Sequence, residues 1–152
     1  MKNISKIALF LDIDGVLNQY NIDSRKYKLK KHQDYNMKPY KKKILKLTKL
    51  IKRYNIHVYI FSAWRQKELE EYLPFKIYGD TRKWAENVIE ISKEYKHNLI
   101  IDDEIQYKTR IFGHERIPLP ENIILHKPYY EFGLINKDFR KLEHILENLI
   151  KL

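Results

Sequence analysis

The sequence contains no cysteine, and this absence sets the first limits on its chemistry. Without a thiol, the chain forms no disulfide, holds no metal through thiolates and has no cysteine nucleophile. A chain free of cysteine suits a reducing compartment, so we expect the protein to be cytoplasmic.

Long apolar runs are also missing. No stretch approaches the roughly 20 residues that a membrane-spanning helix needs, so we predict no membrane span. The opening letters MKNISKIALFLDID imitate a signal peptide, but the apolar run Ile7 to Leu11 stops at Asp12, too early for a signal sequence. Repeats, low-complexity tracts and Gly/Ser linkers are absent as well. We therefore predict one domain over residues 1–152.

Acidic residues are fewer than basic ones: the chain contains 20 Asp and Glu but 30 Lys and Arg, which gives a net charge of +10. Positive charge that is focused on a site raises the on-rate for an anionic partner by about 10- to 1,000-fold. Nucleic acid is therefore a candidate partner. The alternative is compositional bias, because the chain is rich in Lys, Ile, Asn and Tyr.

What the sequence does contain is an alternation of apolar runs and helical patterns. Strands are expected at residues 7–11, 56–61 and 99–101, with shorter ones at 75–78 and 123–125. Helices are expected at 41–54, at 65–73, after Asp80 as the capping residue, and at 136–152; the helix after Asp80 would carry Trp84, Val88, Ile91 and Tyr95 on one face. This alternation predicts an α/β fold, a three-layer Rossmann-like domain with a mainly parallel sheet and helices on both faces.

Polar side chains follow three of the expected core strands. Asp12 and Asp14 follow the first, Ser62 the second, and Asp102 with Asp103 the third. Ligands of open α/β sheets bind beyond the carboxyl ends of the strands. Carboxylates gathered there would repel one another unless a cation lay among them, and oxygen ligands without His or Cys suit Mg²⁺. The sequence therefore predicts a magnesium site.

The order of these groups resembles the motifs of the haloacid dehalogenase-like (HAD) superfamily. The stretch DIDGVL resembles the first motif, Ser62 in VYIFSAWR the second, Lys83 in GDTRKWAENV the third, and the acidic pair in NLIIDDE the fourth. DGVLN, the Ser-x-Trp-Arg of residues 62–65, IIDDE and the late Gly133-Leu134 resemble more closely a branch that includes HAD-like domains found with RNA-repair enzymes.

The resemblance implies a role for each motif residue. Asp12 would be the nucleophile that forms an aspartyl-phosphate, and Asp14 the general acid and base. Mg²⁺ would be held by Asp12, by the backbone carbonyl of Asp14 and by Asp103, with Asp102 behind them or in place of Asp103. Ser62, Arg65 and Lys83 would bind the phosphate, with Ser62 and Lys83 also assisting catalysis. No large cap domain fits between the motifs, which implies an open site that can admit a phosphate on a macromolecule.

Ordinary structural roles compete with these assignments. Asp12 and Asp14 could form a solvated turn, Ser62 could cap the next helix, and Arg65 could pair with Glu68. Lys83 could lie on a solvated face, with Arg82 as its rival. The histidines His57, His97 and His126 lack metal-ligand spacing, and Trp64 and Trp84 are expected to be packing residues.

A short basic flap is expected at residues 16–38. The letters SRKYKLKKHQDYNMKPYKKK, which begin in this flap, interleave tyrosines with lysines. Basic side chains follow a phosphate backbone, and tyrosines stack on bases at about 1–3 kcal/mol each. The alternative is a solvated, charged loop.

The leading hypothesis is a Mg²⁺-dependent phosphatase that acts on terminal phosphates of nucleic acid, RNA above DNA. A phosphatase of nucleotides or phosphoproteins is the nearest alternative. A two-metal nuclease and a non-catalytic nucleic-acid-binding module are alternatives of different classes.

Overall fold

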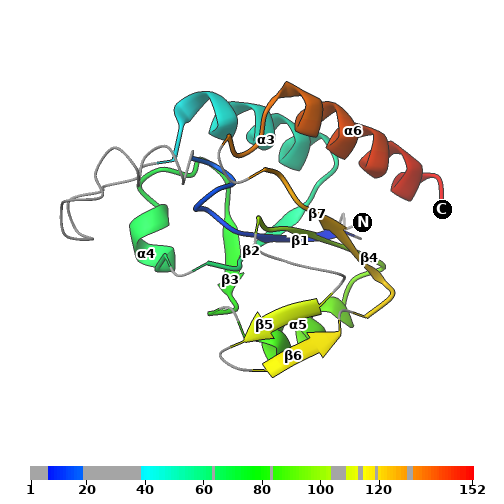
Figure 1. Ribbon diagram of the computed structural model, residues 1–152. Coiled ribbons are helices and arrows are strands. Elements are labelled where there is room, and N and C mark those ends of the chain that lie inside the picture. Colours follow the sequence, from blue (N-terminus) through cyan, green and yellow to red (C-terminus); the bar gives the residue numbers. More distant parts are fainter. Residues whose placement is uncertain are drawn as a thin grey trace.

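The computed structural model of the protein describes residues 7–18, 39–62, 64–82, 84–103, 109–112, 115–118, 120–129 and 132–152. Figure 1 shows the helices and strands formed by these residues. In chain order they are β1 (Ile7–Leu11), α3 (Lys41–Arg53), β2 (His57–Ile60), α4 (Gln66–Leu69), β3 (Ile77–Asp80), α5 (Ala85–Ser92), β4 (His97–Ile101), β5 (Thr109–Phe112), β6 (Glu115–Pro118), β7 (Ile123–His126) and α6 (Asn136–Ile150).

Five of the described strands form one parallel sheet in the order β3-β2-β1-β4-β7. The first of these strands in the chain, β1, is therefore the central one. Every residue of β1 is buried, as its uninterrupted sequence IALFL requires of a strand that is covered on both faces. The expected α/β, Rossmann-like architecture with a parallel sheet is confirmed.

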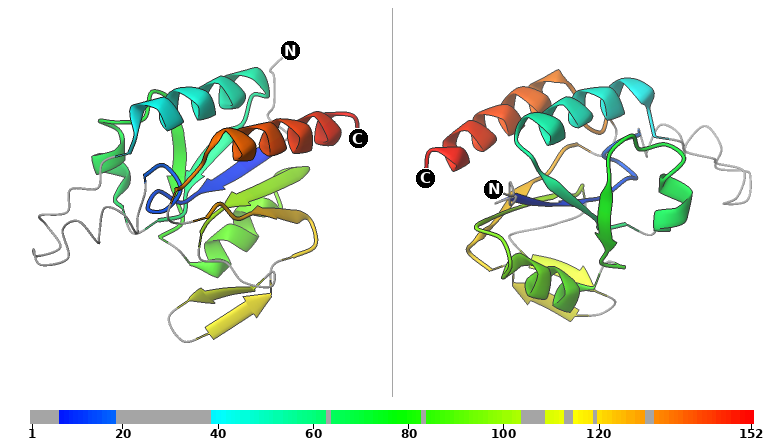
Figure 2. Two further views of the ribbon diagram at one scale, coloured as in Figure 1. Left: turned by 45° about the horizontal axis from the view of Figure 1, so that its top comes forward. Right: turned by 180° about the vertical axis from the view of Figure 1, so that it is seen from behind.

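Helices cover both faces of this sheet (Figures 1 and 2). Alternate residues of β1 point to opposite sides, so Leu9 and Leu11 pack with Leu47 of α3 and Leu146 of α6. On the other side, Ala8 and Phe10 pack with Val88 of α5 and Ile100 of β4. The two apolar clusters hold the sheet edge that carries the polar groups in a fixed position.

The helix α3 follows its sequence pattern closely. Ile44, Leu47 and Ile51 form its buried stripe, and the helix ends one residue before the expected boundary. Asn55 then adopts a positive φ of 50°, and the next amide, that of Ile56, bonds back to the carbonyl of Ile51. A residue in the left-handed region with a bond back to the last turn is a common helix stop.

Several details differ from the expectations. The helix α4 is shorter than predicted, and β3 lies two residues later than predicted. Asp80 does not cap α5, because it ends β3 and its Oδ1 accepts the backbone N–H of Arg82. Trp84 precedes α5 and is 55 % exposed rather than buried, while Tyr95 lies beyond the end of that helix. The antiparallel pair β5–β6 was not predicted at all.

Two other expectations concern the basic flap and membrane-spanning helices. Residues 19–38, most of the basic flap, lie outside the described residues. In the part of the chain that is described, no helix is long and apolar enough to cross a membrane.

Candidate active site

The carboxyl ends of the three middle strands bring the sequence motifs to one edge of the sheet. The register pairs Leu11 of β1 with Ile60 of β2 and with Ile101 of β4. Asp12, one residue past Leu11, is therefore level with Asp102, and Ser62 lies one residue further along the neighbouring strand. The backbone N–H of Asp12 donates to the carbonyl of Ile101 at 3.0 Å, which ties the two acidic segments together.

Three carboxylates gather at this edge. Asp12, Asp102 and Asp103 each offer an oxygen, and these oxygens all lie within 4.8 Å of one another. The side chains are buried: Asp12 is 2 % exposed, Asp102 0 % and Asp103 8 %. Burying like charges this close is costly unless a cation is bound among them, and an all-oxygen donor set suits a hard divalent ion. The cluster could therefore hold a metal ion.

Gly15 fits closely against one member of this cluster. Its φ of +77° lies in the left-handed region, and a Cβ added to it would lie 2.2 Å from Oδ2 of Asp103. Any larger residue would displace that carboxylate. The glycine of the Asp-x-Asp-Gly motif therefore both makes the turn and leaves room for the acid of a different motif.

The side chain of Asp14 is not one of the three carboxylates of this cluster, and it is held by two donors. Its Oδ1 accepts the side-chain amide N–H of Asn18 at 3.0 Å and the indole N–H of Trp64 at 3.0 Å. Asn18 is itself oriented, because its Oδ1 accepts the backbone N–H of Gly15 at 2.8 Å. Of the predicted ligands, Asp12 and Asp103 lie together with Asp102 in the acidic cluster, whereas a role for the Asp14 backbone carbonyl stays a prediction.

Ser62 and Arg65 lie on the segment that leads into α4. Ser62 is buried, and its Oγ accepts the backbone N–H of Trp64 at 3.2 Å, so it closes the turn before the helix rather than capping the helix itself. Arg65 is the N-cap residue of α4, and its backbone N–H donates to Glu68 at 3.0 Å. Within the described residues, the exposed Arg65 guanidinium makes no ion pair, with Glu68 or otherwise, and it could meet a substrate.

Lys83 lies outside the described residues, so its expected role stays a prediction. The turn just before it is described. Arg82 is exposed and has a φ of +54°, which is unusual for a residue with a side chain. Thr81 is buried, and both its N–H and its hydroxyl donate to the carbonyl of Ile60 in β2. This turn ends at the same edge of the sheet as Ser62.

The loop that carries Asp14 is supported from behind by the segment before α6. Gly133, with a φ of +63°, packs so closely that a Cβ would lie 2.4 Å from the carbonyl oxygen of Asn18. The N–H of Leu134 donates to the carbonyl of Val16 at 2.8 Å. Lys43 of α3 donates to the carbonyls of Phe132 and Leu134. The late Gly-Leu pair of the sequence therefore shapes the loop rather than lining the acidic cluster.

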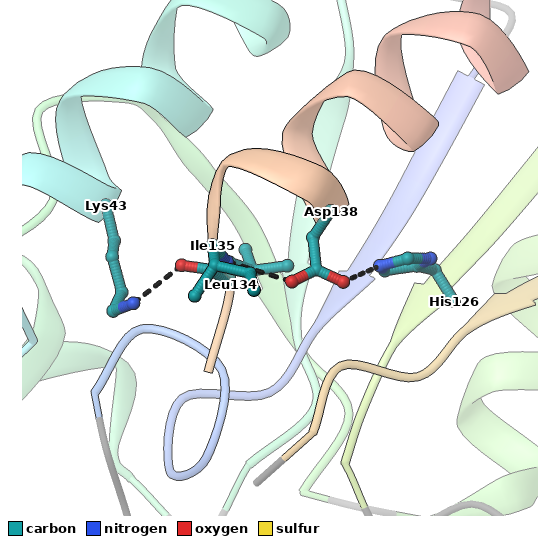
Figure 3. A network of polar contacts seen from close by, with 5 residues as sticks. All are labelled: Lys43, His126, Leu134, Ile135 and Asp138. Carbon is teal, nitrogen blue, oxygen red and sulfur yellow. Dashed lines mark hydrogen bonds and ion pairs between the residues drawn. The ribbon is translucent and has the colours of Figure 1, made fainter. Parts of the chain in front are cut away.

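Figure 3 shows Asp138 of α6 between Ile135 and His126, and this support extends through β7 to the acidic pair. Asp138 of α6 accepts the backbone N–H of Ile135 and a ring N–H of the buried His126, each at 2.9 Å. The carbonyl of His126 in turn accepts the backbone N–H of Asp102 at 3.3 Å. His126, which lacked any metal-ligand spacing, is a structural residue in this arrangement.

Burial governs the protonation of this network. It lowers the pKa of His126, and the opposing effect of Asp138 does not cancel it, so the contact is a hydrogen bond from a neutral ring rather than an ion pair. Because ionised Asp138 can only accept, Nε2 of His126 carries the hydrogen. Burial also lowers the pKa of Lys43, with Asp138 again acting in the opposite direction.

A scan against protein-family models, a search of curated proteins and a search of solved structures each returned no match. The function is therefore argued from the motifs and from the geometry of the sheet edge.

Sequence reasoning missed two residues of this site. Asn18 and Trp64 hold the Asp14 carboxylate, whereas the sequence predicts only a packing role for Trp64 and shows Asn18 only as the last residue of DGVLN. Trp64 does pack as well, since it lies against the main apolar cluster and meets Tyr72 edge-on. Its place two residues after Ser62 was the available signal, because a side chain so close to a strand end faces the same edge.

Proposed function

We propose that the protein is a Mg²⁺-dependent phosphatase of the HAD-like class, without a large cap, that acts through an aspartyl-phosphate on terminal phosphates of nucleic acid. One observation carries the proposal: Asp12, Asp102 and Asp103 are buried together at the carboxyl ends of two adjacent parallel strands, and the residue of the second motif, Ser62, lies two residues past the end of the neighbouring strand β2.

The chemistry follows from the residues at this edge. A carboxylate oxygen of Asp12 attacks phosphorus, and the bond from phosphorus to the leaving oxygen breaks as Asp14 gives that oxygen a proton. A water then attacks the phosphorus of the aspartyl-phosphate and loses a proton to Asp14, which frees phosphate and restores Asp12. Bound Mg²⁺, held by Asp12 and Asp103 with Asp102 beside them, would offset the repulsion between carboxylate and phosphate.

The remaining motif residues would bind the phosphate. The Ser62 hydroxyl can donate to a phosphoryl oxygen while its Oγ still accepts from Trp64. Arg65 and Lys83 would supply positive charge, and Arg65 has an exposed guanidinium for this purpose. The backbone carbonyl of Asp14 would complete the metal site.

The preference for nucleic acid rests on charge. The chain carries a net charge of +10, and the exposed face of α3 presents Lys42, Lys46, Lys49 and Arg53 at helical spacing. A polyanion with a terminal phosphate would meet these cations while its end lies at the acidic cluster. The basic residues of the expected flap would add to this surface.

A phosphate-release screen tests the proposal. Substrates are oligonucleotides phosphorylated at the 5′ or the 3′ end, mononucleotides, phosphopeptides and p-nitrophenyl phosphate, each with Mg²⁺ and with EDTA. We expect Mg²⁺-dependent release, fastest from an oligonucleotide end. Internal scission of a labelled strand would instead indicate the two-metal nuclease. Faster release from mononucleotides or phosphopeptides would indicate that nucleotides or phosphoproteins are the substrates.

The Asp12→Asn variant tests the nucleophile. It keeps the shape of the side chain but removes the attacking charge, so turnover should fall by at least about 1,000-fold while the fold is retained. Beryllofluoride, a phosphoryl analogue, should bind the wild-type protein but not the variant. Near-normal phosphate release by folded Asp12→Asn protein would refute the mechanism.

A further inference from the structure

We infer that Trp64 is a positioning residue that, together with Asn18, fixes which oxygen of Asp14 transfers the proton. The inference rests on the proposed function. Oδ1 of Asp14 receives two hydrogen bonds, one from the indole N–H of Trp64 and one from the side-chain amide of Asn18, each at 3.0 Å. Among the described residues, Oδ2 of Asp14 receives none. The two oxygens of this carboxyl group are therefore not equivalent.

The direction of both bonds is fixed by chemistry. An indole nitrogen only donates, so Trp64 can meet Asp14 only at an oxygen that accepts. The amide of Asn18 can be assigned as well, because its oxygen accepts the backbone N–H of Gly15 at 2.8 Å and its nitrogen must then face Asp14. Two donors converge on Oδ1 and occupy its lone pairs.

The consequence concerns the protonated form of Asp14. A proton placed on Oδ1 would compete with two N–H groups that already point at this oxygen, so the proton resides on Oδ2. In the first step, the proton on Oδ2 moves to the leaving oxygen as its bond to phosphorus breaks. In the second, Oδ2 takes a proton from the attacking water. Trp64 and Asn18 keep the other oxygen turned away from both transfers.

Trp64 connects this arrangement to another strand end. It lies on the segment after β2, its backbone N–H donates to Ser62, and its ring meets Tyr72 edge-on at 6.2 Å between ring centres. Asp14 lies on the loop after β1. The indole bond therefore sets the distance between the loop of the proton donor and the segment of the predicted phosphate-binding serine.

The test compares Trp64→Phe with the wild-type protein on two substrates. Phenylalanine keeps an aromatic ring in the packing but loses the donor. One substrate is p-nitrophenyl phosphate, whose leaving oxygen needs little help from an acid; the other is an oligonucleotide end or a simple alkyl phosphate, whose leaving oxygen must be protonated. The measured quantity is kcat/KM, because it reports steps up to the first release and omits hydrolysis of the aspartyl-phosphate.

We expect Trp64→Phe to lower kcat/KM by roughly 10- to 100-fold for the alkyl substrate, a part of what general acid catalysis contributes, and by less than about threefold for p-nitrophenyl phosphate. The selective loss should disappear in an Asp14→Asn background, because Trp64 acts through Asp14. Trp84→Phe, at a tryptophan that is 55 % exposed, is the matched control and should leave both substrates unchanged.

The outcomes separate the two proposals. If the wild-type protein releases phosphate but Trp64→Phe lowers kcat/KM equally for both substrates, the inference fails and the phosphatase stands. The inference would also be refuted if Trp64→Phe lowered kcat/KM for the alkyl substrate by the same factor in the Asp14→Asn background as in the wild-type protein. If the wild-type protein releases no phosphate from any substrate, the proposed function itself fails.

Discussion

Two structural constraints act at position 15, and only glycine satisfies both. Its φ of +77° favours glycine, and the space beside its Cα is filled by the carboxylate of Asp103, which comes from a different strand end. An alanine would have to adopt a left-handed conformation, at about 1–2 kcal/mol, and would also push against Asp103 of the acidic cluster. Gly15 therefore helps to place the acidic cluster, although it has no side chain that could bind a metal ion.

A Gly15→Ala substitution should reduce both the stability of the fold and Mg²⁺ binding. We expect a loss of about 1–3 kcal/mol in the free energy of unfolding and a weaker affinity for Mg²⁺, because Asp103 must shift. Chemical denaturation measures the first and titration calorimetry the second.

Gly79→Ala is the matched control for this experiment. It adds the same methyl group in β3, where the backbone φ is not in the left-handed region and the nearest atom is a ring carbon of Tyr59 at 3.1 Å. Mg²⁺ affinity should be unchanged in this variant. If Gly15→Ala binds Mg²⁺ as the wild-type protein does, the close contact with Asp103 is not needed for the metal site.

Individual site residues differ in how well the sequence indicated them. Asp12, Asp102 and Asp103 could be found because each follows an apolar run, and a strand end fixes where its next side chain lies. The contact between Trp64 and Asp14 could not be found in this way, since it joins two loops 50 residues apart and depends on side-chain rotamers. Periodicity says nothing about such contacts.

Among the elements, β2 carries an aromatic cluster at the end opposite the candidate active site. His57, its first residue, stacks on Tyr78 with 3.8 Å between ring centres, and its Nδ1 lies 2.8 Å from the hydroxyl of Tyr95. That hydroxyl also contacts the hydroxyl of Tyr59 at 2.7 Å. Burial lowers the pKa of His57, and the nearby Lys76 lowers it further.

This lowered pKa predicts how the stability of the fold changes with pH. The unfolded chain takes up a proton at His57 near pH 6.5, whereas the folded protein does so only at lower pH. Between these two values the unfolded state binds more protons, so the free energy of unfolding falls as the pH falls below about 6.5, by at most about 1.4 kcal/mol per pH unit for one group.

Urea denaturation between pH 5 and pH 8 checks this prediction. His57→Gln removes the titrating group, and its unfolding free energy should therefore depend less steeply on pH than that of the wild-type protein. His126, whose pKa is also lowered, remains in both proteins and cancels in the comparison. Equal pH dependence in the two proteins would show that His57 does not contribute.

The elements that the sequence predicted well are those with a strong repeating pattern. The strand β1 is continuously apolar, and α3 and α6 each carry a full apolar stripe, so their bounds were close to those observed. The short elements were harder, because four residues hold too little pattern to fix a boundary. The pair β5–β6 falls in this class, as do α4 and β3.

In the molecule as a whole, positive charge is distributed along the helices on one face of the sheet. The helix α3 exposes Lys42, Lys46, Lys49 and Arg53, and a cavity of about 350 Å³ between α3 and α6 is lined by three of these and by Arg140. Glu143 offsets part of this charge through its 2.7 Å ion pair with Arg53. Both helices begin near the loop of Asp14. The groove between them therefore starts near the candidate active site and extends along the two helices.

Replacing Lys42, Lys46 and Lys49 with Gln should weaken binding of a single-stranded oligonucleotide and make it less sensitive to salt. Each lost phosphate contact removes about 0.7 from the slope of log affinity against log salt concentration. Turnover of p-nitrophenyl phosphate should be unchanged, because these lysines lie outside the acidic cluster. Binding measured by fluorescence anisotropy across a salt series gives the slope.

The control removes the same charge elsewhere, with Lys76, Lys93 and Lys96 replaced by Gln. If both triple variants lose affinity equally, binding depends on the net charge of the protein and not on the position of the lysines along the groove. A third variant, with Arg25, Lys26, Lys28, Lys30 and Lys31 replaced, tests the flap in the same way. An unchanged salt slope in all three would leave the nucleic-acid assignment without its physical basis.

The central position of β1 also affects how the chain folds during its synthesis. The strand is the first of the described sheet to leave the ribosome, but one of its two neighbours, β4, comprises residues 97–101. Until that segment emerges, one edge of an apolar strand stays open to pairing with other chains, a hazard that chaperones limit. Asp102 and Asp103 arrive directly after β4, so a nascent chain that ends before them lacks two of the three carboxylates of the acidic cluster.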